Sequence, residues 1–171
     1  MRPRILAAIA LTLLRLGSAS AVEEDPVYRE EVFAKVKTAI TSISTAASDG
    51  AKIDEMKKLK AEIESERDRV RKELEGASAS KSAKEKIARL DARDTEILKL
   101  WFSLEPVFEK TLSSSFAENG EFKRASCVAL PDNVKFKDMG GMTDDAPTPP
   151  STALALDLVA SLCESKKSKA P

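Results

Sequence analysis

Apolar residues near the amino terminus form a continuous run that has no counterpart later in the chain. The ten residues 5–14 are apolar apart from one threonine, two arginines precede them, and Ala19 and Ala21 provide an A-x-A site ahead of Val22. This order of features is typical of a secretory signal peptide. Ten residues are too few to span a membrane core as a helix, which needs about 20. We expect a leader (residues 1–21) that is cleaved before Val22, and therefore a secreted or periplasmic protein.

The next apolar positions recur at steps of three and four, which predicts a helix over residues 26–48. Asp25 can cap this helix, Pro26 suits its first turn, and Gly50 can close it. The apolar positions are Val32, Val36, Ala39, Ile40, Ile43 and Ala47.

Two further segments, 51–75 and 83–105, carry apolar residues at alternating steps of three and four, the heptad pattern of a coiled coil. The first pattern reads Ile53, Met56, Lys60, Ile63, Arg67, Val70 and Leu74, and the second reads Ile87, Leu90, Asp94, Ile97, Trp101 and Leu104. Small residues between the two segments predict a short turn, and Pro106 predicts a kink or break after the second. Residues 51–105 are therefore expected to form an antiparallel helical hairpin whose helices are each about 35 Å long.

Charged residues dominate this hairpin. Between Asp54 and Glu96 there are 24 charged residues in 43, of which 12 are acidic and 12 basic, and there is no aromatic residue. Opposite charges lie four residues apart at several places, which stabilises the helices locally. Examples are Lys58 with Glu62, Asp68 with Lys72, and Arg69 with Glu73. We expect the hairpin to stand mostly in solvent, with its charges serving as a solvated surface or as a surface for a partner.

The aromatic residues lie outside the charged segment and predict the position of the core. They are Tyr28, Phe33, Trp101, Phe102, Phe108, Phe116, Phe122 and Phe136. We expect the helix 26–48, the base of the hairpin and a separate helix over 106–118 to pack together. Asn119 and Gly120 would end that last helix.

The last third of the chain contains the only two cysteines, Cys127 and Cys163. An exported protein meets an oxidising compartment, so we expect a disulfide between them, with a stabilisation of about 3 to 4 kcal/mol. A reactive thiol is the alternative, but the chain has no histidine that could serve as its base. We expect residues 127–130 to be extended, 138–150 to be a flexible linker, and 151–166 to form a C-terminal helix tethered by the disulfide.

These patterns together predict an all-α protein in which residues 22–171 form a single domain. Its architecture would be a small helical bundle with a protruding antiparallel coiled-coil hairpin. The apolar stretch of the last helix, 152–163, is too short to span a membrane and contains Asp157, so we expect it to pack in the core.

The absence of histidine also limits the possible chemistry. It excludes the Ser-His-Asp triad, the Cys-His pair and imidazole-bearing zinc sites. Ser78 and Lys81 match an S-x-x-K pattern, but no partner motif follows them. Without the leader, 25 basic and 28 acidic residues remain, a balance that does not favour nucleic acid as a partner. We expect no catalytic residue, no cofactor, no metal and no small-molecule ligand.

The function that best fits these features is that of an exported, non-catalytic helical interaction or adaptor protein that binds a protein partner or a second copy of itself. Three alternatives remain at this stage. They are an extracytoplasmic holdase-type chaperone, a secreted effector, and a hydrolase that uses paired carboxylates. The hydrolase is the least favoured, because the sequence shows no convergent carboxylates, and sequence patterns alone do not choose among the interaction protein, the chaperone and the effector.

Overall fold

The computed structural model describes residues 25–78, 84–113, 116–119, 121–138 and 148–164. The elements in chain order are helices α1 (Pro26–Thr45), α2 (Asp49–Ser78) and α3 (Lys84–Thr111), strands β1 (Ala117–Glu118) and β2 (Glu121–Phe122), and helices α4 (Arg124–Asp138) and α5 (Pro150–Cys163). These elements confirm the all-α helical bundle. The predicted leader, with its cleavage site at Ala19, Ala21 and Val22, and most of the predicted linker 138–150 lie outside the described residues.

Helix α1 begins where the sequence predicts and ends slightly earlier. The Asp25 carboxylate accepts a hydrogen bond from the backbone N–H of Tyr28 at 3.0 Å, and Pro26 occupies the first turn. One face of the helix is buried through Tyr28, Val32, Phe33, Val36 and Ile43. This face packs against α2, α3 and α5, and the opposite face of α1 is exposed.

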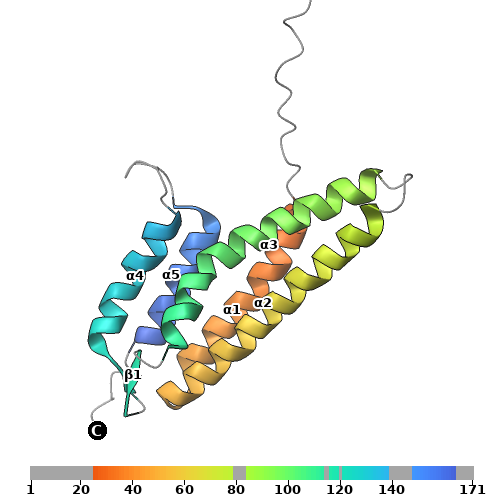
Figure 1. The fold of residues 1–171 in the computed structure, drawn as a ribbon. Coiled ribbons are helices and arrows are strands. Elements are labelled where there is room, and N and C mark those ends of the chain that lie inside the picture. Colours follow the sequence, from red (N-terminus) through yellow and green to blue (C-terminus); the bar gives the residue numbers. More distant parts are fainter. Residues whose placement is uncertain (1–24, 79–83, 114–115, 120, 139–147, 165–171) are drawn as a thin grey trace, which may run out of the picture.

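Helices α2 and α3 form the antiparallel hairpin that the heptads predict (Figure 1). Its buried apolar side chains include Met56, Leu59, Ile63 and Val70 on α2 and Leu90, Ile97, Leu100 and Leu104 on α3. Leu59 is not a predicted heptad position, and it is buried where α2 lies beside α1, next to Ala39 and Ser42. The inner part of the hairpin thus belongs to the common core, and the expectation that the whole arm stands mostly in solvent is wrong for that part.

Helix α3 continues through Pro106, so the predicted break and the separate helix over 106–118 are wrong. Proline has no N–H for the carbonyl one turn earlier, and Figure 1 shows α3 curving along its length towards α4. Pro106, Val107 and Phe108 are buried. Their burial offsets the missing hydrogen bond, and the helix ends at Thr111.

The segment after α3 differs from the prediction in two ways. Asn119 lies in the turn between the paired strands β1 and β2, with φ 54°, instead of ending a helix. Residues 127–130, predicted to be extended, belong to helix α4. Leu130 and Val134 are buried on one face of α4, which packs against α3 and α5, and this burial favours a helix over a strand.

Helix α5 is confirmed; it begins at Pro150, one residue before the predicted start, and ends at Cys163, before the predicted end at 166. Its buried apolar side chains are Leu154, Ala155, Leu158, Val159 and Leu162. A disulfide joins Cys127 of α4 to Cys163 of α5, with Cα atoms 5.6 Å apart, as the sequence predicts. Among the described helices, none has the length and apolar character needed to cross a membrane.

Candidate functional site

The start of α1 divides the hairpin into two parts. Contacts of Tyr28 with Glu66 and of Asp25 with Arg93 mark the level at which α1 begins. Beyond this level the hairpin continues without α1 beside it (Figure 1). We call residues 67–78 of α2 and 84–92 of α3 the outer arm. Only four of its residues are buried, and they are Val70, Ala77, Leu90 and Ala92.

The surface of the outer arm is charged and carries both signs. Arg69 binds Glu73 at 2.5 Å, as predicted, whereas Lys58 on the inner part pairs with Glu55 and not with Glu62. The exposed charged side chains of the outer arm are Asp68, Arg69, Arg71, Lys72, Glu73, Glu75, Lys84, Glu85, Lys86, Arg89 and Asp91. The outer arm therefore has a narrow apolar seam and an otherwise polar, solvated face.

Glu66 holds the base of the outer arm to α1. Its carboxylate accepts hydrogen bonds from the Tyr28 hydroxyl at 3.0 Å, from Lys35 at 3.3 Å and from the Arg69 guanidinium at 2.6 Å. On the other side of Tyr28, Arg93 of α3 lies 5.2 Å from the ring centroid and donates to Asp25 at 2.9 Å. We call these six residues the anchor cluster, because they tie α1 to both helices of the hairpin.

The electrostatics of the anchor cluster follow from these contacts. The hydrogen bonds from Arg69 are the main reason that the pKa of Glu66 falls to about 2, against the opposing effect of burial. Burial, and then the negative charge of Glu66, raises the pKa of Tyr28 above its ordinary value, so this hydroxyl remains a donor. The backbone N–H of Tyr28, followed by Arg93, lowers the pKa of Asp25.

Trp101 explains the two basic residues in the heptad of α2. The ammonium of Lys60 and the guanidinium of Arg67 lie 5.8 and 4.6 Å from the Trp101 ring centroid. Cations over an aromatic face are attracted by its quadrupole, so these basic residues pack in the seam as partners of the indole. The indole N–H donates to Glu105 at 3.3 Å.

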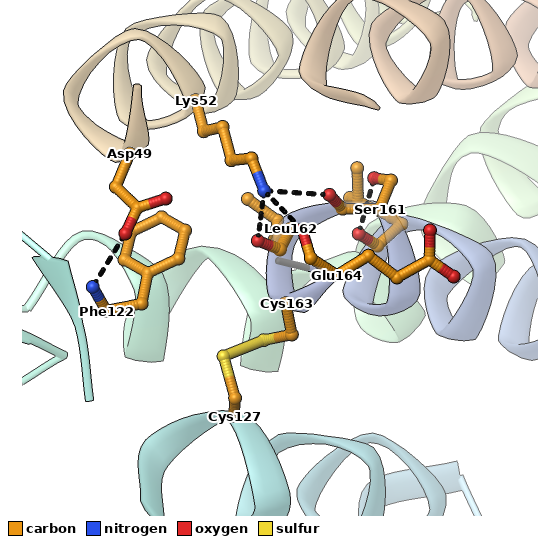
Figure 2. Close-up of a disulfide and its surroundings, with 9 residues drawn as sticks. Asp49, Lys52, Phe122, Cys127, Ser161, Leu162, Cys163 and Glu164 are labelled. Atoms are coloured by element: carbon orange, nitrogen blue, oxygen red, sulfur yellow. Dashed lines mark hydrogen bonds between the residues drawn. A yellow bond between two sulfur atoms is a disulfide. The ribbon is translucent and has the colours of Figure 1, made fainter. Parts of the chain in front are cut away.

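The opposite end of the bundle contains the disulfide and a buried lysine (Figure 2). Lys52 is only 6% exposed, and its ammonium donates to the carbonyls of Ser161, Leu162 and Glu164 at 3.3, 2.7 and 3.2 Å. These are carbonyls at the end of α5, where a positive charge also favours the helix dipole. Lys52 thus caps α5 from α2.

The side chains that the sequence analysis considered for chemistry, Ser78 and the two cysteines, have structural roles in the described part of the chain. The Ser78 hydroxyl donates to the carbonyl of Leu74 at 2.8 Å, and Lys81 lies outside the described residues. Cys127 and Cys163 are joined and offer no free thiol. Across the described ranges, no group of three or more His, Cys, Asp or Glu side chains is arranged to hold a metal ion.

Sequence patterns did not reveal the anchor cluster or the cap by Lys52. Tyr28 and Glu66 are 38 residues apart, and Lys52 and Leu162 are 110 residues apart. Lysine and glutamate are frequent throughout α2, so nothing in the chain marks these two as buried or half-buried. The capping role of Asp25 was the one local signal, and it identified only the start of α1.

Comparisons of the chain with protein-family models, with curated proteins and with solved structures found no match. The function must therefore be inferred from the geometry of the described residues.

Proposed function

We propose that this chain is an exported, non-catalytic interaction protein that binds a protein partner through the outer arm. The observation that carries this proposal is the length of the hairpin beyond α1. Of the four buried side chains of the outer arm, only Val70 belongs to the common hydrophobic core, so the arm adds little to that core. A segment of this length that contributes little to the core is best explained by a role at its surface.

The anchor cluster makes the outer arm suitable for binding. It fixes the base of the arm from α1 through Tyr28, Lys35 and Asp25, so the arm has a defined direction relative to the bundle. A surface that is ordered before binding loses less conformational entropy in the complex than a flexible one. Interspersed charges of both signs select a partner with the complementary pattern and reject others.

The proposed location rests on the disulfide and on the leader pattern. Disulfides persist in oxidising compartments and are rare in the cytosol, so the Cys127–Cys163 bond is compatible with a place outside the cytoplasm. The order of features in residues 1–21, which is typical of a signal peptide, also supports export from the cytoplasm. The proposed lack of catalysis is supported by the missing histidine and by the structural use of Ser78.

A shortened hairpin tests the proposal. Deletion of residues 70–76 and 85–91 removes one heptad from each helix, retains Glu66 and Arg93 of the anchor cluster, and preserves the heptad phase. Photo-crosslinking from Lys72 or Lys86 in the native cell envelope should join the full-length chain to a defined protein. The shortened chain, with the crosslinker at a retained exposed position such as Lys84, should form no such adduct while circular dichroism shows a folded helical protein.

Lys37 on α1 provides the matched control, since its side chain is 60% exposed and, within the described part of the chain, pairs with the exposed Glu30. A crosslinker at Lys37 should give no adduct with the same protein. Equal crosslinking from Lys37 and Lys72, or a shortened chain that still binds the partner, would show that the outer arm is not the binding surface.

A further inference from the structure

The disulfide lies at the surface of the bundle. Cys127 and Cys163 are both partly exposed, and both line two surface cavities of about 540 and 330 Å³. The larger cavity is bordered by charged side chains and the smaller one by apolar groups of α4 and α5. A small thiol in solution therefore has access to the sulfur atoms without unfolding the protein.

The two helices joined by the disulfide are held to the bundle very unequally. In α5, eight of fourteen residues are buried, and Lys52 caps its end. Among the ten residues of α4 whose burial the structure describes, Leu130 and Val134 are buried. Because apolar burial is the main force that docks a helix, this described part of α4, which packs against α3 and α5, is held by fewer buried side chains than α5 and depends more on the disulfide.

The two cysteines also occupy opposite ends of their helices. Cys127 is in the first turn of α4, and Cys163 is the last residue of α5. A thiolate is favoured at the positive N-terminal pole of a helix and disfavoured at the negative C-terminal pole. Four charged residues line the larger cavity. Arg124 is positive and lies one turn before Cys127, whereas Asp49 and Glu164 are negative. The fourth residue, Lys52, donates hydrogen bonds to the carbonyls of α5.

We propose that the Cys127–Cys163 bond is a site of thiol–disulfide exchange that acts as a reversible latch for α4. The thiolate of a dithiol reductant forms a bond to Sγ of Cys163, the bond between the cysteines breaks, and Cys127 leaves as a thiolate. The second thiol of the reductant then attacks the mixed disulfide and releases Cys163. Two electrons pass to the protein, and the reductant departs as a disulfide.

The consequence is a local change in structure. Once the bond is broken, α4 separates from α5 and exposes the apolar wall of the smaller cavity, which includes Leu156 and Val159. Helices α1, α2, α3 and α5 retain their shared core. This latch is independent of the outer arm, which lies at the other end of the hairpin.

Hydrogen exchange of the mature chain, oxidised and then reduced with dithiothreitol under native conditions, tests the latch. Amides of α4 should exchange about tenfold faster or more in the reduced chain, while those of α1, α2, α3 and α5 retain their protection. The latch is refuted if reduction requires denaturant, if α4 keeps its protection, or if protection is lost throughout the bundle together.

The double variant Cys127→Ser and Cys163→Ser is the matched control for effects of the reductant. Without dithiothreitol it should show the exchange pattern of the reduced chain, and dithiothreitol should not alter it; the pattern of the oxidised chain would contradict the latch. Brief exposure to glutathione followed by acid quenching and peptide mapping tests the direction of attack. The adduct should lie on Cys163, and an adduct on Cys127 would overturn the proposed order of steps.

Discussion

Replacement of Glu66 by glutamine tests whether the anchor cluster holds α1 to the hairpin. The Glu66 side chain is 12% exposed and binds Tyr28, Lys35 and Arg69. Its pKa is about 2 in the folded protein, compared with 4.5 for an unperturbed glutamate. Each pKa unit corresponds to about 1.4 kcal/mol. Because Lys35 and Arg69 are 39% and 47% exposed, solvent screens part of this energy, and we expect a loss of about 2 to 3 kcal/mol.

The sign of the pH dependence follows from the direction of the shift. A carboxylate with a lowered pKa in the folded state stabilises the protein fully above its unfolded pKa, and this contribution is lost as pH falls through the folded value. For Glu66 that window lies between about 4.5 and about 2. The difference in the free energy of unfolding between wild type and Glu66→Gln should therefore be largest at neutral pH and shrink across this window.

Urea unfolding followed by far-UV circular dichroism, repeated from neutral pH to about pH 2, measures this difference. Asp25 also has a lowered pKa, but it is present in both chains, so the comparison isolates Glu66. Glu62→Gln is the control, since Glu62 is exposed on the same helix one turn earlier, and it should change stability by less than about 0.5 kcal/mol. A Glu66→Gln effect as small as that of the control, or one that does not change with pH, would refute the reasoning.

Two further substitutions test the hydrophobic core and the capping of α5 by Lys52. Ile63→Ala removes a fully buried side chain from α2 and should lower the free energy of unfolding by about 2 to 5 kcal/mol, as measured by urea unfolding; a loss below 1 kcal/mol would place Ile63 outside the core. Lys52→Met retains the apolar stem but leaves carbonyls of α5 without their donor, which should cost about 1 to 3 kcal/mol. Amides in the last turn of α5 should then exchange faster, and unchanged exchange there would contradict the capping role.

Periodic patterns in the sequence were sufficient to predict the hairpin. Predicted heptad positions such as Ile87 and Leu90, or Ile97 and Trp101, lie three or four residues apart, and this local spacing determines which face of a helix is apolar. Only five residues separate α2 from α3, so the two helices become antiparallel neighbours without help from distant residues. The disulfide was predictable for a similar reason, because two cysteines allow only one intramolecular pairing.

Predictions failed where a short sequence pattern is compatible with two different backbone structures. Pro106 ends a helix when its surroundings are solvated, but here the burial of Val107 and Phe108 outweighs the missing hydrogen bond. The short apolar run from Cys127 to Leu130 fits a strand or a helix equally well. Packing against α3 and α5 favoured the helix, because a helix buries Leu130 and Val134 on one face.

The sequence by itself determined the helical class, the hairpin and the pairing of the cysteines, since each depends on spacing along the chain. Only the tertiary structure decided that α1 covers the inner part of the hairpin, and that Glu66 and Lys52 find hydrogen-bond partners on other helices. These features depend on contacts between residues far apart in sequence, such as Lys52 with Leu162. Spacing along one helix carries no information about which distant side chain will meet it.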